Sequence, residues 1–92
     1  MRTERVFDMW RRGEVTLAEL RGITPAEMEA ARAAAGKLMQ AGALREAEEI
    51  LAGLALYDPF QSATWRLLED LYRRRGNLES ARLFCDIGRA VA

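Results

Sequence analysis

This sequence of 92 residues predicts an all-α fold, on three observations. Residues that favour helices, above all Ala, Leu, Glu and Arg, dominate it, and it contains only two prolines. No run of Val, Ile, Thr or Tyr alternates with polar residues at a spacing of two, as a half-buried strand requires. Matching helix signals also recur 34 positions apart, which predicts two copies of one helical unit.

Composition and charge exclude several classes of function. The 14 basic and 14 acidic side chains cancel, whereas bulk binding of nucleic acid needs a basic excess. The sequence has no histidine and one cysteine, so we expect no metal site and no cofactor, and a reducing, cytoplasmic compartment. No serine stands with a plausible base and no glycine-rich phosphate loop occurs, so we expect no enzyme. The longest apolar run, 50–57, is too short to span a bilayer.

A helical arm is predicted for residues 1–24. Its first helix covers 2–12, where apolar side chains recur at spacings of three and four. This side is more apolar than a solvent-exposed helix needs, so it either docks on the rest of the chain or forms a homodimer contact. The sequence leaves both possibilities open for its four residues, Val6, Phe7, Met9 and Trp10.

The second part of the arm is a short helical turn that begins at Thr16. Glu19, three residues further on, is expected to complete a capping box, in which each side chain bonds to the other residue's backbone amide. Leu17 and Leu20 are expected to face inward, and Gly22 is expected to close the turn.

Four longer helices follow, and ordinary start and stop signals predict their bounds. The first opens with a capping box between Thr24 and Glu27 that has Pro25 at the first helical position. Gly42, Gly76 and the pair Asp58-Pro59 each end a helix. The predicted ranges are about 25–41, 44–57, 61–75 and 78–90.

The four helices become two copies of one unit when Gly42 is aligned with Gly76. A helix–turn–helix period of 34 residues is the tetratricopeptide signature. We therefore predict two tetratricopeptide-like repeats, about 25–58 and 61–91, in a domain that covers 25–92. The landmarks that pair are Leu38 with Tyr72, Leu44 with Leu78, Ala47 with Ala81, Ala31 with Trp65, Ala34 with Leu68, and Leu51 with Cys85.

The spacing also assigns structural roles to five residues. Trp65 and Tyr72 are expected in the core because of their repeat positions. Cys85 is expected to be a packed structural thiol. Tyr57 is expected to pack where the two repeats meet, and Asp58 either caps the following helix or ends the preceding one.

The first helix of each repeat is expected to line a concave face, which is the predicted partner-binding groove. Arginine side chains pair well with carboxylates, so an acidic segment is one ligand that fits, and a solvated charged surface is the alternative. The predicted groove residues are Glu29, Arg32, Gly36, Met39 and Gln40 from the first repeat and Arg66, Asp70, Arg73 and Arg74 from the second.

Residues 16–92 also resemble a known family, and four short motifs carry the resemblance. They are TLAELRGIT at 16–24, QAG at 40–42, EAE at 46–48 and ALYDPF at 55–60. In this order they are similar to the class II chaperones of bacterial type III secretion systems, which hold hydrophobic translocator proteins before export. The resemblance implies a cytoplasmic chaperone that binds a secreted translocator or needle protein, and family members often dimerise through N-terminal helices.

The sequence departs from that family in two ways. Members normally carry three repeats, so this chain is expected to be a short or truncated relative. Aromatic residues line the family's first repeat where Arg32, Gly36 and Met39 stand here, which favours a secreted subunit other than one with the usual short translocator motif. The alternatives are a generic tetratricopeptide adaptor unrelated to secretion, or a regulator that sequesters a transcription factor.

Overall fold

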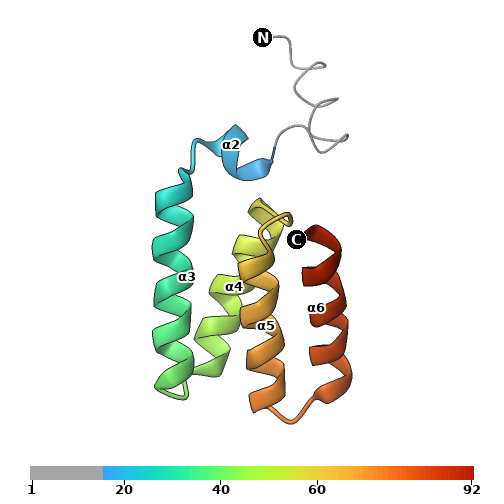
Figure 1. Cartoon of the computed structure of the whole chain (residues 1–92). Coiled ribbons are helices and arrows are strands. Elements are labelled where there is room, and N and C mark those ends of the chain that lie inside the picture. Colours follow the sequence, from blue (N-terminus) through green and yellow to red (C-terminus); the bar gives the residue numbers. More distant parts are fainter. Residues whose placement is uncertain (1–15) are drawn as a thin grey trace.

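The computed structural model describes residues 16–92, and this part of the chain is all-α, as predicted (Figure 1). No strand occurs within these residues, and none of their helices is long and apolar enough to cross a membrane. The predicted bounds of the four long helices are confirmed to within one residue. The predicted helix at 2–12, with Val6, Phe7, Met9 and Trp10, lies outside the described residues. The five helices within residues 16–92 are α2 (Leu17–Arg21), α3 (Pro25–Gln40), α4 (Leu44–Tyr57), α5 (Ser62–Arg74) and α6 (Leu78–Val91).

A complete capping box determines where α3 begins. The Thr24 hydroxyl oxygen accepts a hydrogen bond from the backbone N–H of Glu27 at 3.1 Å, and Glu27 Oε1 accepts one from the backbone N–H of Thr24 at 3.0 Å. These bonds satisfy amides that have no partner inside the helix. They favour the ionised carboxylate, so the backbone bond from Thr24, followed by its hydroxyl, lowers the pKa of Glu27. Pro25 occupies the first helical position, as predicted.

The short helix α2 differs from the prediction in two details. The Glu19 backbone N–H donates to Thr16 Oγ1 at 3.2 Å, but the Glu19 carboxylate accepts from the Thr16 hydroxyl rather than from its amide. Leu20 is 43 % exposed, so its predicted inward orientation is wrong. Ala18, at 2 % exposed, packs in the core instead. A helix of five residues makes little more than one turn, so it presents few side chains to its neighbour.

The turns that close the two hairpins share one backbone geometry. Gly42 has φ 82° and Gly76 has φ 79°, in the left-handed region that favours glycine. The residue after each glycine donates its N–H back into the preceding helix, Ala43 to Leu38 O at 2.8 Å and Asn77 to Tyr72 O at 2.9 Å. Helices α4 and α6 also begin and end at positions that differ by 34. The predicted offset is therefore present in the backbone.

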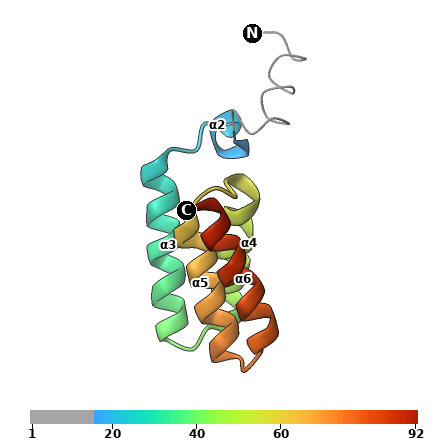
Figure 2. The same cartoon turned by 45° about the vertical axis from the view of Figure 1, so that its right-hand side comes forward.

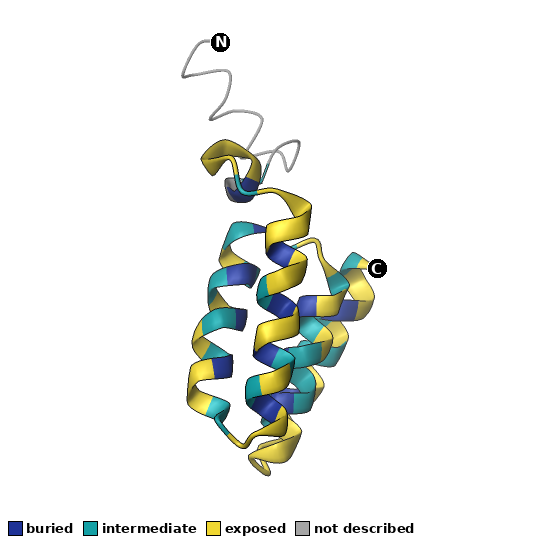
Figure 3. Ribbon diagram, turned by 90° about the vertical axis from the view of Figure 1, so that its left-hand side faces the viewer, coloured by how far each residue is buried: buried dark blue, intermediate teal, exposed yellow. Residues whose placement is uncertain are grey.

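The helices stack in chain order (Figures 1 and 2). Helix α3 packs on α4, α4 on α5 and α5 on α6, and the first helices of the two hairpins, α3 and α5, also contact each other. Helix α2 lies at the end of the stack where α3 begins and α4 ends, and it contacts α4. Figure 3 shows buried positions recurring along the inner sides of the helices, with exposed positions facing outward.

Small and medium-sized aliphatic side chains form most of the core. Trp65 and Tyr72 are half-buried rather than enclosed, and they pack against this core with Phe84. The Phe84 ring centroid lies 6.0 Å from that of Trp65 and 5.1 Å from that of Tyr72. Cys85 is also only half-buried. The core cluster consists of Ala18, Met28, Ala35, Met39, Ala47, Leu51, Leu54, Leu68 and Leu71.

Candidate protein-binding site

The structure divides the predicted groove residues of α3 into buried and open positions. Met39 is 2 % exposed and belongs to the core cluster. Arg32 is 9 % exposed. Glu29 and Gln40 are exposed and Gly36 is half-buried, so the first repeat offers a narrower surface than the spacing predicted.

The predicted groove residues of α5 are more open, but two of its arginines already have partners. Arg66, Arg73 and Arg74 are exposed, and Asp70 is half-buried. Arg73 Nη2 lies 2.8 Å from Glu69 Oε2, and Arg74 Nη2 lies 3.3 Å from Asp70 Oδ2. These ion pairs use donors that an acidic ligand would need.

Arg74 also ties the two hairpins together. Its Nη1 donates to the backbone carbonyl oxygen of Met39 at 3.0 Å, near the C-terminal end of α3. Carbonyl groups in the last turn of a helix lack partners inside that helix and carry a partial negative charge. The bond therefore gives Arg74 a structural role that its place in the predicted groove did not suggest.

A polar cluster that the spacing did not predict joins α4 to α5. The Tyr72 hydroxyl donates to Glu48 Oε2, and Arg75 Nη1 donates to Glu48 Oε1 at 2.9 Å. The Arg75 guanidinium also lies 5.3 Å from the centroid of the Tyr72 ring. The bond from Tyr72 lowers the pKa of Glu48, and the same bond raises the pKa of Tyr72. A tyrosine at a core position signals that its hydroxyl needs a partner, but nothing in the sequence selects Glu48.

An apolar groove of about 270 Å³ lies between α3 and α4. Two small residues line it: Ala31, where the second hairpin has Trp65, and Gly53, where an added Cβ would meet no atom within 4 Å. The predicted site was the concave face, so the sequence analysis did not select this groove. The groove is lined by Ile23, Glu27, Met28, Ala31, Glu49, Ile50, Gly53, Leu54 and Tyr57.

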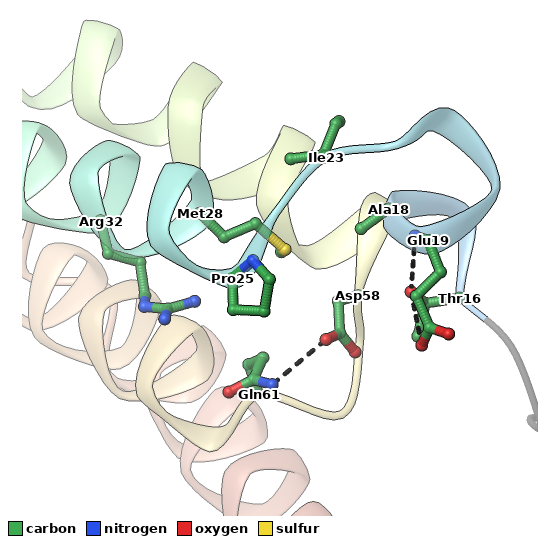
Figure 4. A pocket seen from close by; sticks show the side chains of 9 residues that line it. All are labelled: Thr16, Ala18, Glu19, Ile23, Pro25, Met28, Arg32, Asp58 and Gln61. Carbon is green, nitrogen blue, oxygen red and sulfur yellow. Dashed lines mark hydrogen bonds between the residues drawn. The ribbon is translucent and has the colours of Figure 1, made fainter.

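A second pocket, of about 260 Å³, opens among α2, the start of α3 and the turn between α4 and α5 (Figure 4). Asp58 shapes that turn, because Oδ1 accepts from the Phe60 N–H at 3.1 Å and Oδ2 from Gln61 Nε2 at 3.2 Å. Asp58 thus ends α4, whereas Gln61 stands at the N-cap of α5. The pocket is lined by Thr16, Ala18, Glu19, Ile23, Pro25, Met28, Arg32, Asp58 and Gln61.

Within residues 16–92, no group of three or more His, Cys, Asp or Glu side chains is placed to hold a metal ion. Comparisons of the chain with protein-family models, with curated proteins and with solved structures found no match. The resemblance to the secretion chaperones therefore stays a prediction from the four motifs quoted above.

Proposed function

We propose that this chain is a non-catalytic, tetratricopeptide-like chaperone of a bacterial type III secretion system. It would hold a secreted translocator or needle subunit in the cytoplasm before export. The motifs at 16–60 support the family, and the matching turns at Gly42 and Gly76 support the repeat. The observation that carries the binding role is the apolar groove between α3 and α4.

The groove suits an apolar segment of a client protein. A chaperone that keeps a hydrophobic subunit from aggregating must cover that subunit's apolar surface, and burying one large aliphatic side chain contributes about 1.5–3 kcal/mol. Ile50, Leu54 and Tyr57 supply the apolar lining, and Glu27 and Glu49 add negative charge beside it. The best client segment is therefore apolar with basic residues next to it, because its charges would then complement these carboxylates.

Co-expression with the secreted subunit encoded beside this chain tests the proposal. The wild-type chain should keep that subunit in the supernatant and co-purify with it. Gly53→Gln should reduce capture at least about tenfold, because the new side chain fills the groove while glutamine favours the helix. Gly36→Gln is the matched control, since Gly36 is also helical, has open space at its Cβ and lies on the predicted concave face.

Three outcomes would contradict parts of this proposal. Loss of capture by Gly36→Gln alone would place the client on the concave face. Full capture by both variants would reject both surfaces. A subunit that stays insoluble with the wild-type chain would reject the chaperone role and favour a generic adaptor. The burial of Arg32 and Met39 also favours an adaptor, because the family has aromatic groove residues at these two positions.

A further inference from the structure

The pocket beside α2 contains a buried arginine that has most of its donors free. Arg32 is 9 % exposed, and its Nη2 donates to Glu29 Oε2 at 2.7 Å. Among residues 16–92, neither its Nε nor its Nη1 has a hydrogen-bond partner, and both atoms are buried. Removing a guanidinium from water without pairing its N–H groups is costly, so a buried arginine in this state indicates a missing acceptor.

The pocket presents a donor side and an acceptor side. Figure 4 shows the Arg32 guanidinium turned from α3 toward Pro25 and Gln61. Asp58, also 9 % exposed, lines the same pocket, and each of its carboxylate oxygens accepts one hydrogen bond and keeps further lone pairs. The volume of about 260 Å³ is several times the ~30 Å³ that one water occupies, so a side chain or a terminal residue fits.

We propose that this pocket binds a carboxylate carried by a peptide of the client protein. The carboxylate oxygens accept hydrogen bonds from the free N–H groups of Arg32, and Asp58 accepts one from a neighbouring peptide N–H of the same ligand. That the peptide belongs to a client rests on the proposed function. The affinity of the pocket for a carboxylate does not.

The carboxylates around the pocket disfavour a phosphate more strongly than a ligand with a single negative charge. Among residues 16–92, Arg32 is the only cation that lines the pocket, whereas Glu19 and Asp58 line it and Glu29 contacts Arg32. A phosphate near neutral pH carries up to two negative charges and would be repelled more strongly by these carboxylates. A carboxylate carries one, and the peptide N–H beside it can donate to Asp58.

The second repeat supplies a matched control. Arg66 lies 34 positions after Arg32, at the same register of the equivalent helix, and it is exposed. A change at Arg66 removes the same charge from the same helix register without altering the pocket. Any effect that arises from net charge alone should therefore be equal at the two positions.

The test is an NMR titration of the full 92-residue chain, labelled with ¹⁵N, with four small probes. The probes are N-acetylglutamate α-amide for a side-chain carboxylate, N-acetylglycine for a terminal carboxylate, the uncharged N-acetylglutamine amide, and inorganic phosphate. A carboxylate probe should shift the Arg32 Nε–H signal saturably and bind at least tenfold more tightly than the uncharged probe. The carboxylate that binds more tightly identifies its source as a side chain or a chain end.

Variants separate the pocket from the rest of the surface. The variants are followed by the backbone amide signals of residues that line the pocket, because the Arg32 Nε–H signal is lost with the arginine. Arg32→Gln should abolish the saturable shift of these signals and Arg32→Lys should weaken it, whereas Arg66→Gln should leave it unchanged. Arg32→Gln should keep or raise the melting temperature, because it removes a buried charge; if it does not fold, Arg32→Lys carries the comparison.

Several results would overturn the proposal. They are no saturable shift with either carboxylate, equal binding of the uncharged probe, tighter binding of phosphate, or binding that survives the changes at Arg32. A normal titration together with failure of client capture would reject the proposed chaperone function and leave the pocket intact.

Discussion

The two helical hairpins have closely matching bounds, yet they bury different positions. Arg32, Ala35 and Met39 are buried in the first hairpin. The equivalent residues of the second hairpin, Arg66, Glu69 and Arg73, are exposed or half-buried. The first hairpin is covered by α5 and α2, whereas α6 packs mainly on α5. Position in the stack therefore decides burial more than side-chain size does, as expected where each unit contacts only its neighbours.

The largest expected effect compares two residues at one repeat position, Leu51 and Cys85. Leu51 is 0 % exposed, so Leu51→Ala should lower the free energy of unfolding by about 3 kcal/mol, within a range of about 2–5. Cys85 is half-buried and smaller, so Cys85→Ala should cost about 1 kcal/mol or less. Urea unfolding at equilibrium measures both values. Equal losses would mean that the two hairpins are buried alike, and would refute the comparison.

A second prediction concerns the close approach of α6 to α5. A Cβ at Gly88 would lie 3.4 Å from the Cβ of Trp65, whereas the equivalent position of the first hairpin holds Leu54. Gly88→Leu should destabilise the protein by about 1–3 kcal/mol, because the larger side chain forces the helices apart. Gly36→Leu, where an added Cβ meets open space, is the control and should cost little. A near-normal melting temperature for Gly88→Leu would show that α6 moves freely.

A third prediction tests the polar cluster that joins the two hairpins. Tyr72→Phe removes the hydrogen bond to Glu48 and should cost about 1 kcal/mol at neutral pH. Because this bond lowers the pKa of Glu48 from 4.5, its contribution is present above that pH and is lost as the pH falls below it. The difference between Tyr72→Phe and wild type should therefore shrink below about pH 4. Chemical unfolding across pH 3–7 measures it, with Tyr57→Phe as the control; a difference that stays constant would exclude Glu48 as the partner.

The smallest expected effect is at Arg74, which links α5 to the end of α3. Arg74→Gln should cost under about 1 kcal/mol, because it loses the bond to the Met39 carbonyl at a side chain that is 42 % exposed. Arg45→Gln is the control, since Arg45 and Glu49 form a pair at 3.8 Å with both side chains largely exposed. That control should change stability by less than about 0.5 kcal/mol in thermal unfolding. An equal loss of stability from both variants would show that the bond from Arg74 to Met39 adds nothing to the free energy of unfolding.

Helix bounds were predictable because their signals act over a few residues. The capping box at Thr24, the left-handed glycines 42 and 76, and Asp58 before Pro59 each satisfy or interrupt backbone hydrogen bonds within one turn. The candidate site was predictable only in part. Helical spacing placed Arg32 and Met39 on one side of α3, but it did not indicate that both would be buried.

The sequence by itself determined an all-α chain with hairpin turns 34 residues apart, because both properties depend on local backbone chemistry and side-chain spacing. Tertiary structure alone decided which positions became core and which remained open as the apolar groove. It also decided that Arg32 lines a pocket while some of its N–H groups have no hydrogen-bond partner. The reason is that burial depends on which helices lie beside a given side. Arg32 and Arg66 occupy the same position in their two hairpins. Arg32 is buried and Arg66 is exposed, because α3 and α5 have different neighbouring helices.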